Sequence, residues 1–363
     1  MSVDISYKKQ STLFLILIVI VFFVVEGSAR SYEFFLQDCN LENAESLKKI
    51  DYFSKRQICY DQQNLVYSQN PILSLIPNQH LKTVNINSDG FRGSELETDY
   101  TYRVFVIGGS TVFGAGLPSD EFTIPSKLEK LLNEQENKTE VINAGISSIT
   151  SFEELYHIKE KLLDYNPNMI IIYNGVNDVF YKKINEPEIL DSDSDSDSET
   201  KDYQRYLRSP VVLYRSFILP LMNTEIFDSP GNHHSVEKYD PIISQKIASL
   251  WEKRMNEFCE ISEMKNIESI VIIQPALYNE KKLLSNFEES IVRENIHGQK
   301  TFEEIIEKSK NLENCSLVLD YTAIFENVSD SIYFDQVHTN SLGNKIISER
   351  MFHDIHYLVD SEN

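Results

Sequence analysis

The feature that most constrains the fold is a regular alternation of short, continuously apolar runs with helix-like segments. The first run is Tyr102 to Ile107, and apolar residues at helical spacing follow over Ile124 to Leu132. A second run at Val141 to Asn143 precedes a helical pattern over Ser151 to Leu163, and a third run is Met169 to Tyr173. Strands without polar alternation are typical of parallel sheets that helices cover on both faces. The sequence therefore predicts an α/β fold with a parallel sheet.

The alternation continues in the C-terminal part of the chain. A helix around Ile247 to Ile261, a fourth strand at Ile270 to Ile273, a fifth strand at Leu317 to Leu319 and a last helix from Ser341 to about Leu358 are expected. Two local patterns add detail. Ser151 and Glu154 have the spacing of a capping box at a helix start. The stretch Asn85 to Arg92 is typical of a turn, with Gly90 expected at positive φ.

The remaining segments are assigned around this region. Residues 1–29 are expected to be a membrane anchor or signal segment, residues 30–100 an N-terminal extension, and residues 101–363 the main domain. An insertion at about 179–241 could cover the site. It contains an Asp-Ser repeat, Asp191 to Ser198, which cannot bury apolar surface and is predicted to be disordered. Calcium binding by this repeat is the alternative, but the glycine and glutamate spacing of calcium loops is missing.

The N-terminal segment predicts export. Leu13 to Val25 is unbroken apolar sequence, and Lys8 and Lys9 precede it, which places the N-terminus in the cytosol and the rest outside. Extended to Ser11 through Ala29, the segment spans roughly 28 Å as a helix, enough to cross a membrane. A cleaved signal peptide is the alternative, because Gly27-Ser28-Ala29 resembles a cleavage site. We favour a retained single anchor helix.

The net charge and the cysteine spacing limit which partners and ligands are expected. The formal net charge of −22 repels phosphate backbones, so no nucleic acid partner is expected. The four cysteines match no zinc pattern, and no metal is expected. Outside the cytosol, Cys39 with Cys59 and Cys259 with Cys315 are plausible disulfides; four buried free thiols are the alternative.

Ser110 is the candidate nucleophile. It follows the first strand directly, after Gly108 and Gly109, and so lies in the crevice where open α/β sheets bind ligands. The two small neighbours let a substrate approach and leave the Ser110 N–H facing an oxyanion. The alternative is a phosphate-binding loop, but no Gly-Lys-Ser/Thr follows, which excludes a P-loop.

A serine hydroxyl needs a base, and His338 is the best candidate among the eight histidines. Asp335 lies three residues before it, a spacing that lets the carboxylate hold one ring nitrogen while the other faces the serine. The rivals are interpreted as surface or packed side chains: His233, His234, His157, His353 and His356.

Oxyanion donors are expected at two further strand ends. Gly145 follows the second strand and offers a backbone N–H, and Asn177 follows the third and offers a side-chain N–H. Taken singly, a turn glycine and a turn-capping amide are the simpler interpretations. Three consecutive strand ends that deliver donors into one crevice favour an oxyanion hole of Ser110, Gly145 and Asn177.

These four blocks resemble the SGNH, or GDSL-type, hydrolases. The blocks are Gly108-Gly109-Ser110, Asn143-Ala144-Gly145, Gly175-Val176-Asn177-Asp178 and Asp335-Gln336-Val337-His338. The resemblance covers about residues 100 to 358 and implies a three-layer α/β/α sandwich with a flavodoxin-like parallel sheet. It implies Ser110 as nucleophile, His338 as base, Asp335 as its orienter, and an oxyanion hole from the Ser110 and Gly145 N–H groups and the Asn177 side chain. Gly109 departs from the aspartate commonly found before the serine.

The sequence and this resemblance together predict an exported serine esterase that acts on a small-molecule, glycan or lipid ester and needs no cofactor. The rival hypothesis is a non-catalytic or acyl-transferring accessory protein in extracellular polysaccharide assembly. Turnover of a simple nitrophenyl ester distinguishes the two.

Overall fold

The computed structural model describes residues 6–36, 38–68, 71–135, 138–180, 239–279, 281–292 and 296–360. The Asp-Ser repeat and His233 and His234 lie outside the described residues, as does most of the predicted insertion. The chain forms two compact units. Helix α1 (Tyr7–Leu36) belongs to one, and the described residues from 40 onward belong to the other.

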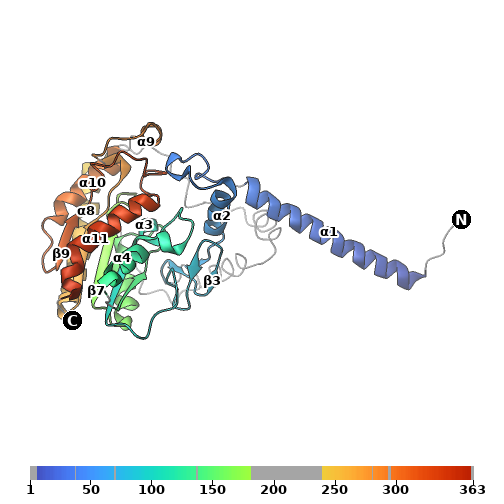
Figure 1. Cartoon of the computed structure of the whole chain (residues 1–363), viewed down its shortest axis with the longest axis horizontal. Coiled ribbons are helices and arrows are strands. Elements are labelled where there is room, and N and C mark those ends of the chain that lie inside the picture. Colours follow the sequence, from blue (N-terminus) through green and yellow to red (C-terminus); the bar gives the residue numbers. More distant parts are fainter. Residues whose placement is uncertain are drawn as a thin grey trace. The chain divides into compact units, whose positions relative to one another are not determined.

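The core of the larger unit is a five-stranded sheet in the order β6-β5-β7-β8-β9. Figure 1 labels its strands β7 and β9. Every neighbouring pair in it is parallel. The prediction of a parallel, flavodoxin-like sheet is confirmed, because β5, the first strand of this sheet along the chain, lies between the second, β6, and the third, β7. The strands are β5 (Tyr102–Gly108), β6 (Thr139–Asn143), β7 (Met169–Asn174), β8 (Glu268–Ile273) and β9 (Leu317–Asp320).

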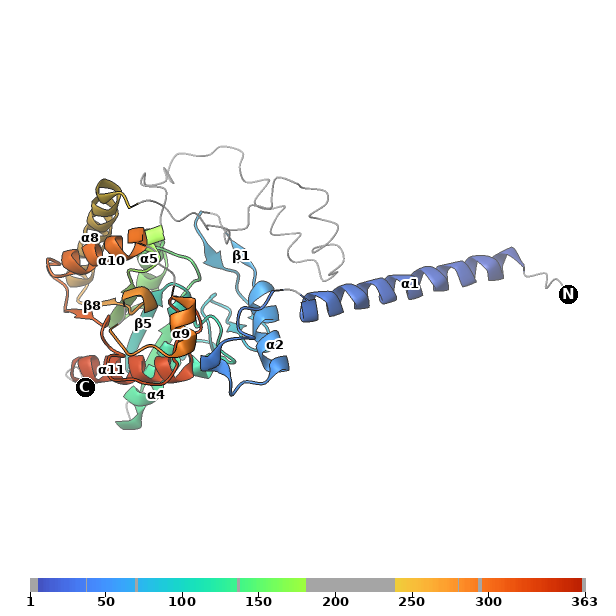
Figure 2. The same ribbon diagram turned by 90° about the horizontal axis from the view of Figure 1, so that it is seen from above.

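Helices cover both faces of this sheet, which makes three layers (Figure 2). Ile170 and Ile172 of β7 pack in one apolar cluster, whereas Met169 and Ile171 pack in the other. This period of two explains why central strands with helices on both faces have no polar side. Helices α5 (Ser151–Glu160), α8 (Pro241–Met264) and α10 (Ile296–Ser309) contribute to the first cluster, and α4 (Ile124–Leu132) and α11 (Ser341–Asp360) to the second.

The start of α5 differs from the prediction by one residue. The capping box is formed by Thr150 and Glu153, and the Thr150 N–H donates to the Glu153 carboxylate at 2.8 Å. Ser151 and Glu154, the predicted pair, lie inside the helix and are buried. The sequence offers two capping boxes one residue apart, Thr150 with Glu153 and Ser151 with Glu154. The buried contacts of Ser151 and Glu154 favour the first, which is the one observed.

Residues 40–100 fold onto the main domain with structure that the sequence did not reveal. They form α2 (Tyr52–Gln63) and two short antiparallel pairs, β1 (Tyr67–Ser68) with β2 (Ser74–Leu75) and β3 (Gln79–His80) with β4 (Asn85–Ile86). Gly90 has φ +78°, as predicted for the turn after β4. Two residues on, the buried Arg92 guanidinium donates to the carbonyls of Phe113 and Gly114 at 2.9 and 2.8 Å. The extension is thereby joined to the backbone just after Ser110.

Helix α1 is long and apolar enough to cross a membrane. It contains the whole predicted apolar run, and the side chains from Leu13 to Val25 are exposed. These properties are compatible with a membrane anchor or a signal sequence.

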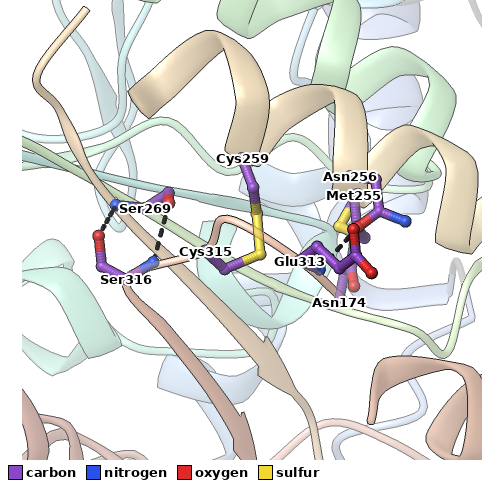
Figure 3. The surroundings of a disulfide bond; sticks show 8 residues. All are labelled: Asn174, Met255, Asn256, Cys259, Ser269, Glu313, Cys315 and Ser316. Atoms are coloured by element: carbon purple, nitrogen blue, oxygen red, sulfur yellow. Dashed lines mark hydrogen bonds between the residues drawn. A yellow bond between two sulfur atoms is a disulfide. The ribbon is translucent and has the colours of Figure 1, made fainter. Parts of the chain in front are cut away.

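A disulfide joins α8 to the segment before β9 (Figure 3). The sulfur atoms of Cys259 and Cys315 are bonded, with a Cα–Cα distance of 4.7 Å. Beside the disulfide, the Ser269 N–H donates to the Ser316 hydroxyl at 3.0 Å, and the Ser316 N–H donates to the Ser269 hydroxyl at 3.2 Å. The predicted Cys259–Cys315 pair is confirmed, whereas the Cys39–Cys59 pair stays a prediction.

Candidate active site

The candidate site lies where the order of the strands reverses. Ser110 is the first residue of the short helix α3 (Ser110–Phe113), directly after β5, and Asn177 follows the neighbouring strand β7. The connection from β5 leads to β6 on one side, while β7 lies on the other. In doubly wound sheets, ligands bind in the crevice at such a point, outside the carboxyl ends of the strands.

Three of the predicted residues form a continuous chain of hydrogen bonds. The Ser110 hydroxyl oxygen lies 2.7 Å from His338 Nε2, and His338 Nδ1 lies 2.6 Å from Asp335 Oδ2. The other carboxylate oxygen of Asp335 accepts the N–H groups of Val337 and His338 at 2.9 and 2.8 Å. Asp335 therefore fixes both the ring of His338 and the backbone turn that carries it.

The loop that carries Asp335 and His338 is closed on itself. The Phe334 N–H donates to the His338 carbonyl at 3.1 Å, and Tyr333 and Thr339 form an antiparallel bridge. The Phe334 ring stacks on the His338 imidazole, with centroids 5.6 Å apart and planes inclined by 7°. These contacts limit the orientations that the imidazole can take.

A buried ion pair holds the start of this loop. Glu288 of α9 (Asn286–Ile291) accepts the Ile332 and Tyr333 N–H groups at 2.9 and 3.2 Å. Lys282 lies 2.8 Å from the same carboxylate, and both side chains are fully buried. The contact of this pair with the loop is not predictable from local sequence, because Glu288 lies 44 residues from Ile332 in the chain.

The environment adjusts the pKa values of the histidine and the aspartate in opposite directions. Burial disfavours the charged imidazole, but the adjacent Asp335 carboxylate outweighs it and raises the pKa of His338 above its ordinary value. Burial also disfavours the charged carboxyl, but interaction with His338 and the two backbone N–H groups lowers the pKa of Asp335. The pair thus favours an ionised aspartate beside a basic imidazole.

Asn177 is held against the turn before Ser110. Its Nδ2 donates to the Ile149 carbonyl at 2.7 Å, which leaves one of the two amide hydrogens for another acceptor. A Cβ atom at Gly109 would lie 2.3 Å from that nitrogen. Any other residue at position 109 would therefore displace the Asn177 side chain.

The backbone N–H of Gly145 was expected to be free to bind an oxyanion, but it already has an acceptor. Its N–H donates to the Asn143 side-chain oxygen at 3.0 Å. A Cβ atom at Gly145 would lie 2.2 Å from the Phe113 backbone nitrogen, so the glycine lets the segment after β6 approach α3. The predicted role of the Gly145 N–H in an oxyanion hole stays a prediction, and the Asn143 oxygen competes for that N–H.

Ser148 has an unusual backbone conformation close to Asn177. It is exposed, has φ +70°, and immediately precedes Ile149, whose carbonyl holds Asn177. Among the described residues, no hydrogen-bond acceptor is found for the N–H groups of Ser148 and Ser110. A serine at positive φ carries no sequence signal, since that conformation favours glycine and asparagine.

The three described histidines that were weighed as rivals of His338 lie outside this arrangement. His157 is buried and its Nε2 lies 2.8 Å from the Leu73 carbonyl oxygen, whereas His353 and His356 are on α11, where a ring nitrogen of each is bonded to a residue of the same helix. The described residues also contain no cluster of three or more side chains of the kind that binds a metal ion.

No family model and no curated protein matches the chain. Several solved structures are similar to it. They include an acetyl xylan esterase (15% identity, 70% of this chain and 99% of that one, TM-score 0.42) and a putative lipolytic protein of the G-D-S-L family from Desulfitobacterium hafniense (16%, 70% and 99%, 0.39). A mutant of an acetyl-xylooligosaccharide esterase from Geobacillus is another (15%, 72% and 96%, 0.41). At such values, the assignment of fold and chemistry depends on the strand order and site geometry of this chain itself.

Proposed function

We propose that the chain is an exported serine esterase of the SGNH type that cleaves carboxylic esters through an acyl-enzyme. The observation that carries the proposal is the continuous series of hydrogen bonds from Ser110 through His338 to Asp335. A nucleophile, a base and an orienting carboxylate in this order are the minimum that serine hydrolysis requires. Their place at the reversal point of the sheet gives a substrate access to the serine.

In the proposed reaction, the Ser110 hydroxyl oxygen attacks the ester carbonyl while His338 Nε2 takes the hydroxyl proton. The same proton then passes to the leaving alcohol, and a covalent acyl-serine remains. Water attacks the acyl-serine with His338 again as base, which releases the acid and restores the serine. Asp335 stays ionised and stabilises the imidazolium in both steps.

The developing oxyanion needs donors that are already in place. The Ser110 N–H and the second amide hydrogen of Asn177 are the proposed donors, together with Gly145 as the resemblance implies. The Gly145 N–H donates to the Asn143 side-chain oxygen, and that bond would have to be given up or shared in the transition state.

The proposed location is outside the cytosol, with α1 as a membrane anchor. The lysines before the apolar run give the orientation. The Cys259–Cys315 disulfide agrees with an oxidising compartment, where such bonds persist.

The test is hydrolysis of 4-nitrophenyl acetate by the full chain in detergent micelles. The wild type is expected to turn over the ester, Ser110→Ala to be inactive at unchanged thermal stability, and Ser290→Ala, an exposed serine on α9, to match the wild type. Activity that survives in Ser110→Ala would rule out the mechanism. A wild type that binds glycan but releases no nitrophenol would instead favour the non-catalytic accessory protein. A series of esters with longer acyl chains then separates glycan acetyl groups from lipid chains, and release of free acid separates hydrolysis from acyl transfer.

A further inference from the structure

A buried polar cluster lies behind the candidate site, and the proposed reaction makes no use of it. Its members come from α5, from α8 and from the end of β7 with the turn that follows, and each is at most 5% exposed. They are Ser151, Glu154, Asn174, Asp178, Trp251 and Arg254.

Asp178 is the centre of one half of the cluster. Its carboxylate accepts both the backbone N–H of Ser151, at 3.2 Å, and the Ser151 hydroxyl. Arg254 of α8 donates to the same hydroxyl at 3.1 Å and lies 3.9 Å from the carboxylate. Asp178 therefore connects the turn after β7 to the first residue of α5 and to α8.

Glu154 is the centre of the other half. Its carboxyl accepts the Asn174 amide, whose oxygen in turn accepts the Trp251 indole N–H at 3.1 Å. The second carboxyl oxygen of Glu154 and the Nε of Arg254 have no hydrogen-bond partner among the described residues. Two buried carboxyl groups thus face a single guanidinium group, with Glu153 of α5 as a further acidic neighbour.

Stability does not explain this arrangement. Burial raises the pKa of Asp178 to about 6, and burial together with the Asp178 charge raises the pKa of Glu154 well above its ordinary value. With a pKa of about 6, Asp178 is mostly ionised at neutral pH and faces Arg254. Desolvation of such groups is costly, and apolar residues of the same size often serve stability as well or better.

The cluster does have a geometric consequence for Asn177. Asp178 is the next residue in the chain, so its bonds fix the backbone of Asn177. Ser151 is two residues after Ile149, whose carbonyl accepts the Asn177 amide at 2.7 Å. The Asp178–Ser151 contact therefore holds the amide from both ends, through its own backbone and through its acceptor.

We propose that Asp178 is a positioning residue for the Asn177 amide, and that its bonds to Ser151 keep the second amide hydrogen aimed at the oxyanion. This inference rests on the proposed function. Asp178→Asn should lower kcat on the order of 10-fold, less than the 10²–10³-fold that loss of a whole oxyanion donor costs. KM should change little, because a misplaced donor is lost mainly in the transition state.

A double-mutant cycle separates positioning from a merely structural role. We expect Asp178→Asn to lower kcat for 4-nitrophenyl acetate in the wild type but by less than about twofold in the Asn177→Ala background, where no amide remains to be positioned. Equal losses in both backgrounds would overturn the inference while leaving the esterase mechanism intact. Unchanged kcat in Asn177→Ala alone would overturn both this inference and the proposed donor.

If Asp178→Asn does not fold, Ser151→Ala provides the second variant, because it removes the hydroxyl contact and keeps both charges. It should show the same dependence on Asn177. The matched control is Ser244→Ala on α8, which removes a fully buried hydroxyl that is hydrogen-bonded to Thr301 at 2.8 Å. This control should lower thermal stability and leave kcat unchanged; a loss of kcat equal to that of Ser151→Ala would contradict the positioning role.

Discussion

The two sides of the candidate site are built in different ways. On the proposed base side, Asp335 and His338 lie three residues apart on one loop and contact each other directly. Contacts with distant residues, Ser110 and Glu288, hold that loop in place. On the proposed oxyanion side, the Asn177 amide donates to Ile149, 28 residues away, and the next residue, Asp178, belongs to a buried cluster that includes Arg254 of α8. Local sequence therefore specifies the Asp335–His338 contact, whereas the position of the Asn177 amide comes from tertiary packing alone.

Substitutions on the two sides should therefore affect turnover and folding differently. If the proposed roles hold, a change on the base side removes a reacting group or its orienter, so its effect on the reaction should be large and its effect on folding small. A change on the oxyanion side moves a donor through its supports, so its effect on the reaction should be smaller and accompanied by altered stability.

The largest effect is expected for the base itself. His338→Ala should lower kcat by on the order of 10⁴-fold or more, because the serine then has no proton acceptor. Adding Ser110→Ala to His338→Ala should lower kcat no further, since the two residues act as a unit. Steady-state kinetics of the single and double variants check this, and multiplicative losses would show that the two residues act separately.

The next effect is expected for the orienter. Asp335→Asn should lower kcat by up to about 10⁴-fold, because it spoils the orientation of the imidazole. His338 must be neutral to act as base, so wild-type activity should fall as the pH drops through a pKa above the ordinary histidine value. The variant loses the carboxylate that raises this pKa, so its acid limb should move to lower pH. A pH–rate profile with an unmoved limb would contradict the assignment of Asp335.

A smaller effect is expected on the oxyanion side. Gly109→Ala should lower kcat by about 10²–10³-fold, because the added Cβ would lie 2.3 Å from the Asn177 amide nitrogen and must displace it. Gly109 has φ −74°, which alanine adopts without strain, so the cause is contact alone. The loss should shrink to near zero in the Asn177→Ala background, and an equal loss there would point to a different target.

The smallest effect on activity is expected at the disulfide. Cys259 and Cys315 lie near the amino-terminal ends of β8 and β9, at the opposite end of the sheet from Ser110. Replacement of both by alanine should cost about 2–4 kcal/mol of unfolding free energy and leave kcat unchanged. Denaturant unfolding measures the free energy, and ester turnover without denaturant measures kcat. A large loss of kcat in the folded variant would show that the two ends of the sheet are coupled.

The sequence predicted those parts of the molecule that depend on local pattern. All five strands of the central sheet were found, because continuous apolar runs such as Met169 to Tyr173 have no polar face. The contact of Asp335 with His338 follows from their spacing. The resemblance added the sheet order, which periodicity alone does not give.

The parts that the sequence missed depend on partners distant in the chain. The capping box was misplaced by one residue because Asp178, 27 residues away, takes the Ser151 hydroxyl. Helices α2, α9 and α10 were missed, since their apolar positions are few and their buried faces mix polar residues with apolar ones. The acceptor of the Gly145 N–H and the positive φ of Ser148 are likewise products of loop packing.

The central claim is that His338 activates Ser110 as a nucleophile, and covalent labelling tests it most directly. The full chain in detergent is treated with a serine-directed phosphonate and the modified peptide is identified by mass spectrometry. We predict a single modified serine, Ser110, in the wild type, and labelling that is slower by orders of magnitude in His338→Ala at the same pH. Modification of another serine, or equal labelling rates in the two proteins, would contradict the account.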